Sequence, residues 1–265
     1  MSGLIWKLNR LRVMTFGEIL FRVWRAFLTS AERYRLTAGW QPLPKSHVGT
    51  KTGLFGQDVL LISQWQQYFQ LDTPQLQYYL EGKIGFFGHD RLDTGMPVYW
   101  HREPVTGTES PLVFGKQLNY RDDAVVGNVK FLWELGRHQH LVPLAVAYAV
   151  SGDNKYKSSI AGQISTWIDS NPFGVGIHWC SALEVSLRMI SWSLVHSLLV
   201  LRDGGEGLFD VVSEPSILGN SIYQHCYFVR HFLSRHSSAN NHLIGELTGL
   251  WVACQVFNLG DQGDQ

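Results

Sequence analysis

The chain has 265 residues, which is long enough to bury a sizeable core in one large domain or two small ones. Lysine plus arginine and aspartate plus glutamate number 22 each, so the charge balance gives no indication of nucleic acid or an anionic membrane surface as a partner. Charged residues are only 17% of the chain, while Trp, Tyr and Phe number 10, 10 and 14. This composition is typical either of a well-packed core or of a ligand groove lined with aromatic rings, as in carbohydrate binders.

Cysteines and long apolar runs exclude several further classes. Cys180, Cys226 and Cys254 lie far apart without CxxC spacing, so neither a zinc site nor a disulfide framework is predicted. No run of about 18 apolar residues occurs, so no transmembrane segment is predicted. The N-terminal stretch "MSGLIWKLNRLRVMTFGEILFRVWRAF" interrupts its apolar residues with Arg, Lys and Glu, unlike a secretory signal. Thr15 and Glu18 instead predict a capping box that opens an amphipathic helix.

Composition divides the chain into three segments. Residues 1–80 are predicted to be helical stretches separated by turns. Residues 81–127 are dense in Gly, Pro and Asp with short β-prone islands, which predicts irregular structure or a small hairpin. An irregular segment of this length in a compact domain is often functional. Residues 128–265 are predicted to form successive helices.

The helical segment favours an all-α fold of antiparallel helical hairpins. Apolar residues recur at helical spacing across residues 128–152, where Gly152 stands at a C-terminal cap position. The same periodicity predicts further helices over 154–170, 181–201 and 216–234, and one beginning near residue 240. Short turns and the lack of strand alternation support this fold class. Periodicity alone does not choose between an open solenoid and a closed toroid.

The stretch "RHSSANNHLIGELTGLW" joins a polar helix start to an apolar run. A buried helical stripe is predicted at Leu243, Ile244, Leu247, Leu250, Trp251 and Cys254. Asn240 is then a good N-cap, and one cap needs only one asparagine. Asn241 and His242 add donors at the positive end of the helix dipole, which predicts a site for an anion, most naturally a carboxylate. Glu246, one turn after His242, would orient the imidazole; the alternative is an exposed, salt-bridged face.

Two other stretches gather polar residues. "WELGRHQHL" places Glu134, Arg137, His138 and Gln139 within about one turn, either as a solvated face or as part of a wet cleft beside Trp133. "NPFGVGIHWCSALE" gives backbone freedom at two glycines just before a His-Trp pair.

The end of the second stretch, Ser181-x-x-Glu184, is interpreted as a capping box rather than as a catalytic site. No paired carboxylates indicate hydrolysis, and no Gly-rich loop indicates a P-loop.

Three long segments carry a resemblance to a known family. "NVKFLWELGRHQHLVPLAVAYAVSGDNKY", "NPFGVGIHWCSALEVSLRMISW" and "SSANNHLIGELTGLW", in this order and spacing, resemble the N-terminal domain of the heparinase II/III-like polysaccharide lyases. The resemblance covers roughly residues 80–258. The family includes bacterial heparinases and related alginate lyases. It implies an incomplete (α/α) toroid whose concave face holds a uronate-containing chain, followed by a β-sandwich domain.

The resemblance also implies a chemistry and a set of site residues. These lyases cleave by β-elimination: a base removes the C5 proton of a uronate and an acid protonates the oxygen leaving from C4. Donors must neutralise the neighbouring carboxylate for this to occur, and Asn241 and His242 match the family's asparagine and histidine. The candidate substrate-binding residues are Asn240, Arg137, His138, Gln139, His178, Trp179 and Glu246.

Two departures from the family pattern stand out. The family usually has Asn where this chain has Gly136. The family's proton-shuttling tyrosine, the β-sandwich and its bound metal come after the Asn-His element, whereas this chain ends at Gln265. We therefore interpret the chain as a fragment of a longer lyase, without a cofactor of its own, and expect it to be inactive alone.

Two other functions remain open at this stage. One is a non-catalytic carbohydrate-binding toroid that keeps the groove without the chemistry, and the other is a helical-repeat scaffold for protein partners. Anionic polysaccharide is the expected partner, whether heparan-type, alginate or an exopolysaccharide. The resemblance implies a periplasmic or secreted protein, and a native N-terminus would imply a cytoplasmic one. Oligomeric state and localisation are not predicted from the sequence.

Overall fold

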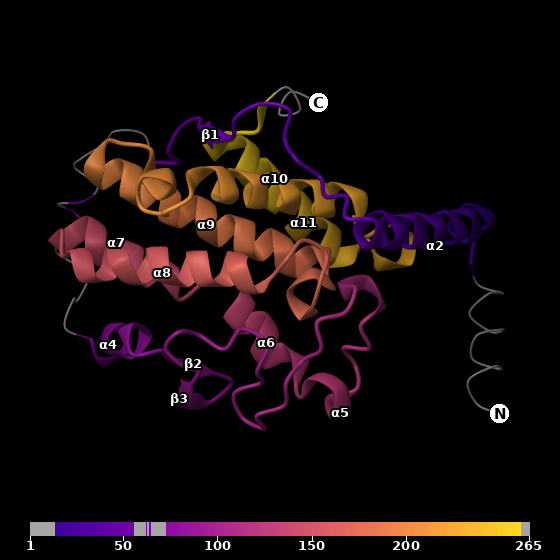
Figure 1. Ribbon diagram of the computed structural model, residues 1–265, viewed down its shortest axis with the longest axis horizontal. Helices are drawn as coiled ribbons and strands as arrows, with labels where there is room; N and C mark the ends of the chain where they lie inside the picture. The colour runs from indigo at the N-terminus through magenta and orange to yellow at the C-terminus, as the bar shows by residue number, and fades with distance from the viewer. Residues whose placement is uncertain (1–13, 56–61, 63, 65–72, 261–265) are drawn as a thin grey trace. The chain divides into compact units, whose positions relative to one another are not determined.

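The computed structural model describes residues 14–55, 62, 64 and 73–260, and the chain divides into two compact units, 1–41 and 42–265 (Figure 1). The first unit contains helix α2 (Phe16–Thr37). The Thr15 hydroxyl accepts a hydrogen bond from the backbone N–H of Glu18 (3.2 Å), which confirms the predicted cap. The Glu18 carboxylate pairs with Arg22 at 2.8 Å instead of completing the capping box.

The second unit is all-α, as predicted, with small two-stranded sheets among its described residues. Its α-helices, within the described residues, are α4 (Pro74–Leu80), α5 (Asp123–Val126), α6 (Val129–Gly136), α7 (Leu141–Ser151), α8 (Asn154–Ser170), α9 (Ala182–Asp203), α10 (Pro215–His231) and α11 (Asn240–Val256). Short 3₁₀ turns are η1 (Gly115–Gln117), η2 (Ile177–Trp179), η3 (Gly207–Asp210) and η4 (His236–Ser238). The strands are β1 (Gly49–Thr50) with β4 (Phe257–Asn258), and β2 (Lys83–Phe86) with β3 (His89–Asp93), both pairs antiparallel. The toroidal closure implied by the family stays a prediction.

Helix α9 is the central element of this unit, since α7, α10 and α11 all pack against it. Large aromatic side chains fill the core around it; Trp100, Trp167, Trp179 and Trp192 are all fully buried. By length and composition α9 is apolar enough to cross a membrane, although the sequence predicted no transmembrane segment. Because 72% of its most apolar window is buried inside the structure, α9 has the burial of a core helix.

The predicted helix over 128–152 is two helices, α6 and α7, with a turn between them. His138 lies in this turn with φ +58°, a left-handed conformation that a continuing helix does not contain. Pro143 gives the physical reason, because within a continuous helix its ring would clash with the carbonyl of Gln139. The predicted cap at Gly152 is confirmed, with φ +72°.

Helix α11 begins at Asn240 as predicted, but the predicted burial of its apolar stripe is wrong for three of the six residues. Ile244, Leu247 and Trp251 are 68%, 48% and 62% exposed. The face toward α9 carries small residues: a Cβ added to Gly249 would lie 2.8 Å from the Cα of Ser186. Close approach of the two helices therefore selects the glycine face, and the larger apolar side chains point outward.

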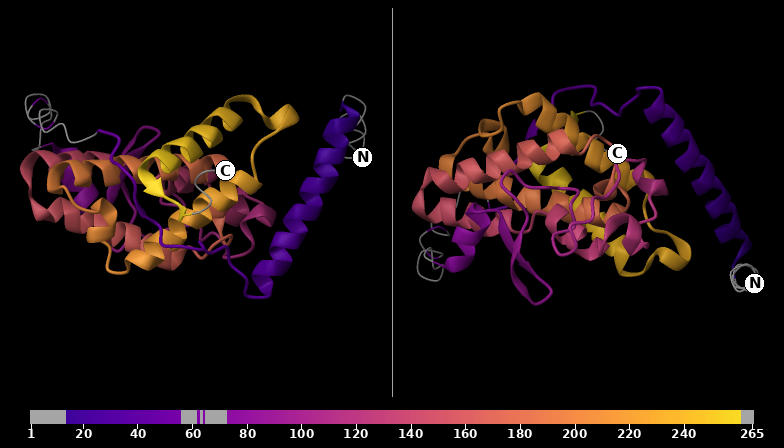
Figure 2. Two further views of the ribbon diagram at one scale, coloured as in Figure 1. Left: turned by 90° about the horizontal axis from the view of Figure 1, so that it is seen from above. Right: turned by 60° about the horizontal axis from the view of Figure 1, so that its bottom comes forward.

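The irregular segment 81–127 contains the predicted small hairpin, β2–β3. Figure 2 shows it projecting from the helices of this unit. Strand β2 contacts both α4 and α6, so the hairpin lies beside the turn that joins α6 to α7.

Candidate functional site

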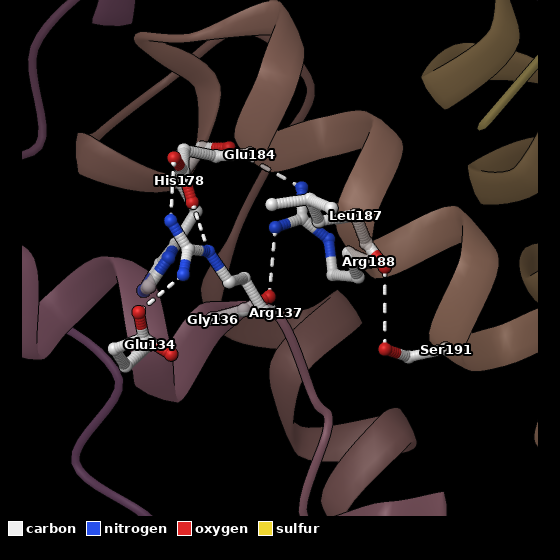
Figure 3. A network of polar contacts seen from close by, with 8 residues as sticks. All are labelled: Glu134, Gly136, Arg137, His178, Glu184, Leu187, Arg188 and Ser191. Carbon is white, nitrogen blue, oxygen red and sulfur yellow. Dashed lines mark hydrogen bonds and ion pairs between the residues drawn. The ribbon is translucent and has the colours of Figure 1, made fainter. Parts of the chain in front are cut away.

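An ion-pair network joins the end of α6 to the first turn of α9 (Figure 3). Arg137, the C-cap of α6, donates from Nε to Oε2 of Glu184 at 2.6 Å and from Nη2 to Oε1 at 3.0 Å. Its Nη1 contacts Glu134. Burial lowers the pKa of Arg137, but the hydrogen bonds and charges of Glu184 and Glu134 outweigh burial and leave it raised. The predicted Ser181–Glu184 capping box is wrong, because Ser181 makes no side-chain cap bond and Glu184 is committed to Arg137.

A second arginine lies beneath this network with no exposed surface. Arg188 donates to His225 Nε2 (2.9 Å) and to the carbonyls of Gly136 (2.9 Å) and His178 (3.2 Å), and it lies 4.1 Å from the Trp167 ring centroid. Burial lowers the pKa of Arg188 to about 9. The departure at Gly136 has a steric reason here, since an added Cβ would lie 2.1 Å from His178 Nδ1.

Three of the predicted substrate-binding residues belong to the core. His138 accepts from Trp192 Nε1 at 2.8 Å, His178 donates to the carbonyl of Trp100 at 2.7 Å, and Trp179 donates to the carbonyl of Asn171 at 3.2 Å. His138, His178 and Trp179 are at most 1% exposed. Burial lowers the pKa of both histidines well below the usual value, so both are neutral at neutral pH. The expectation that these side chains contact substrate directly is not met, because no surface of them is accessible.

The polar start of α11 is exposed. Asn240, Asn241 and His242 all lie at the surface, and Asn240 Oδ1 accepts from the backbone N–H of His242 at 3.1 Å. Asn240 therefore does the work of a cap, although it is itself the first residue of the helix. Within the described part of the chain, the side chain of Asn241 makes no hydrogen bond.

Glu246 was predicted to pair with His242, but the two side chains do not pair in the structure. It is buried and accepts from the backbone N–H (2.6 Å) and the hydroxyl (2.7 Å) of Ser234. These bonds fix the segment between α10 and α11 to the second turn of α11. Glu246 thereby holds the polar helix start in place without facing it.

The N-terminal end of α9 contacts both the Arg137 network and helix α11. Glu184 in its first turn binds Arg137, and Leu183 beside it packs against Gly245 of α11, where an added Cβ would come within 2.6 Å of Leu183 Cδ1. This shared neighbour is consistent with one groove that includes Arg137 and His242, which stays a prediction.

Two pockets lie on the hairpin side of this region, and neither was predicted from the sequence. One, of about 680 Å³, is lined by α4 and the β2–β3 hairpin; the other, of about 350 Å³, lies between β2 and the α6–α7 turn. Gln139 is exposed and lines the second pocket together with Glu134. The signal that could have located them is the aromatic "GFFGHD" between two β-prone runs. Among the described residues, no three His, Cys, Asp or Glu side chains are grouped to hold a metal ion.

Comparison with known proteins places this all-α domain in a class of polysaccharide lyases. The family model described as "Heparinase II/III N-terminus" matches residues 76–258, more than half of the chain. The chain therefore belongs to the heparinase II/III family, which confirms the resemblance seen in the sequence.

One curated relative has a related name. A heparin-sulfate lyase of Bacteroides stercoris is 35% identical over 66 residues, which are 25% of this chain and 10% of that protein. The match thus spans a small part of that relative's length. No solved structure matches the chain.

Proposed function

We propose that this chain supplies the uronate-binding part of a lyase that cleaves anionic polysaccharide by β-elimination. The observation that carries the proposal is the exposed pair Asn241 and His242 in the first turn of α11. Family membership supports a polysaccharide as the substrate, and the relative from Bacteroides stercoris is named a heparin-sulfate lyase.

The chemistry explains why amide and imidazole donors are needed at this place. The C5 proton of a uronate is barely acidic while the adjacent carboxylate carries its full charge. As the proton leaves, negative charge builds on the carboxylate oxygens, and positioned donors stabilise that charge. The positive end of a helix of 17 residues adds to the same effect.

The two asparagines have separate roles in this proposal. Asn240 uses its side-chain oxygen to cap the helix. The amide of Asn241, which has no hydrogen-bond partner among the described residues, is then left to donate to the carboxylate. His242 supplies a second donor beside it. Arg137 is neutralised by Glu134 and Glu184, so we assign it to positioning rather than to substrate charge. These residues thus stabilise charge and transfer no proton.

The experiment measures equilibrium binding of a uronate tetrasaccharide, from alginate or heparan sulfate, to the chain. The control ligand is the same tetrasaccharide with its carboxylates reduced to hydroxymethyl groups. We expect the wild-type chain to prefer the uronate form, and Asn241→Ala to remove most of that preference. Equal binding of both ligands by the wild-type chain would refute the proposal.

A further inference from the structure

We infer that the groove along the β2–β3 hairpin binds additional sugar units of the same anionic polysaccharide, away from the start of α11. This hairpin groove is lined by aromatic and cationic side chains, chiefly Tyr78, Tyr79, Phe86, Phe87, Lys83 and Arg91. The inference rests on the proposed function for the identity of the polymer.

The two pockets adjoin each other between α4 and the α6–α7 turn. Tyr79, Gly85, Phe86 and Phe87 line both of them. The second pocket ends at Gln139 and Glu134, and Glu134 is the partner of Arg137. A polymer lying in the hairpin groove would therefore approach the ion-pair network at the end of α6.

Phe87 is the residue that the fold alone does not explain. Phe86 pairs with His89, so Phe87 and Gly88 form the two-residue turn of the hairpin, with φ of +50° and +83°. Such turns strongly prefer Asn, Asp or Gly at the first position, because a bulky residue is strained at positive φ. Phe87 is nevertheless 57% exposed, and its ring meets that of the buried Phe131 edge-on, with 5.3 Å between the ring centroids. Strain of this kind is concentrated at functional sites.

One cation beside these rings fits an anionic sugar. Arg91 lies over the Tyr78 ring, 4.5 Å from its centroid, whereas Lys83 is already paired with Glu81 at 2.8 Å. Asp90 is the carboxylate among the lining residues of the larger pocket. A uronate unit has an apolar ring face and a charged substituent, which an aromatic ring and a neighbouring cation can contact together.

The test compares affinities for a uronate tetrasaccharide and a dodecasaccharide of the same polymer. Phe87→Asn removes the ring and supplies the residue that the turn prefers, so we expect the melting temperature to be kept. We expect it to weaken dodecasaccharide binding roughly tenfold and leave tetrasaccharide binding unchanged. Phe87→Trp should retain the affinity. Arg91→Gln should act like Phe87→Asn, whereas its matched control Arg102→Gln, another arginine stacked on a tyrosine, should not.

The outcomes separate the two proposals. An unchanged ratio of dodecasaccharide to tetrasaccharide affinity in both Phe87→Asn and Arg91→Gln would overturn the hairpin groove. Tetrasaccharide binding that is unaffected by Asn241→Ala would overturn the proposed function, whatever the hairpin variants do. A wild-type chain that binds neither oligosaccharide would overturn both.

Discussion

Arg137 and Glu184 are 47 residues apart in sequence and form a two-point hydrogen bond between the end of α6 and the first turn of α9. The Glu184 side chain is 5% exposed and that of Arg137 is 20% exposed, so water screens the pair weakly. Leu183, the residue before Glu184 in α9, packs against Gly245 of α11. The first turn of α9 therefore helps to position both the Arg137 ion-pair network and helix α11, which carries Asn241 and His242.

The first prediction concerns this pair. Glu184→Ala should lower the free energy of unfolding by about 2–3 kcal/mol, because it leaves a half-buried guanidinium with only Glu134 as its acidic partner. Glu184→Gln should cost less, since the amide oxygen can still accept one hydrogen bond. Urea denaturation of both variants, of Arg137→Met alone and of each variant combined with Arg137→Met measures the coupling. A coupling near zero would mean that the pair contributes nothing to stability.

The second prediction separates the two asparagines. Asn240→Ala should cost about 0.5–2 kcal/mol of stability as a lost cap and leave catalysis largely intact. Asn241→Ala should leave stability unchanged and lower the kcat of the proposed elimination by roughly 10²–10³, with a smaller change in KM.

The product of elimination carries a double bond conjugated to the carboxylate, so turnover is followed by near-ultraviolet absorbance. Normal turnover with Asn241→Ala and a collapse with Asn240→Ala would show that the two roles are exchanged. Normal turnover with both would remove the start of α11 from the mechanism.

Local patterns in the sequence predicted the elements that depend on local physics. Helix α8 follows its apolar period from Asn154 to Ser170, and Gly152 takes the left-handed conformation expected at the C-terminal cap position predicted for it. The start of α11 and the cap by Thr15 were predicted on the same grounds. Each of these features is decided within a few residues of chain.

Contacts between residues far apart in the sequence determine the features that local patterns failed to predict. Ser181-x-x-Glu184 has the local pattern of a capping box, but a guanidinium from another helix outcompetes a single backbone N–H for the carboxylate. A long-range contact also explains the exposed apolar residues of α11. The glycines of α11 permit a closer approach to α9 than its larger apolar residues would, so the glycine face packs inward. The aromatic hairpin groove depends on the turn at Phe87, which no propensity would place there.

The third prediction is a loss of stability in mild acid. Burial lowers the pKa of His140 and of His196 from 6.5 to about 4, and that of His138, His178 and His225 well below 6.5. Unfolded histidines take up protons below about pH 6.5 while these stay neutral in the folded state. Stability should therefore be complete above pH 6.5 and fall progressively as the pH drops toward 4.

His140→Gln checks this mechanism, because glutamine does not titrate there and can still donate to Gln163 as the imidazole does. Chemical denaturation at several pH values should show a slope smaller by up to about 1.4 kcal/mol per pH unit between pH 4 and 6.5. An unchanged slope would exclude His140 from the acid response.

The last prediction tests the packing of α11 on α9. In an exposed helix, Gly→Ala would add up to about 1 kcal/mol of stability through helix propensity. At Gly249 the new Cβ would lie 2.6–2.8 Å from the Cβ, Cα and carbonyl oxygen of Ser186, so the helices must separate, at a cost of about 1–3 kcal/mol. The clash should outweigh the gain in helix propensity, and thermal denaturation should show Gly249→Ala to be destabilised.

Two control variants accompany this prediction. At Gly245 the added methyl meets only the end of the Leu183 side chain, which can rotate away, so Gly245→Ala should be nearly neutral. Ile244→Ala, at a position 68% exposed, should change stability by less than about 0.5 kcal/mol. A larger loss for Ile244→Ala than for Gly249→Ala would mean that the apolar stripe, and not the glycine face, packs against α9.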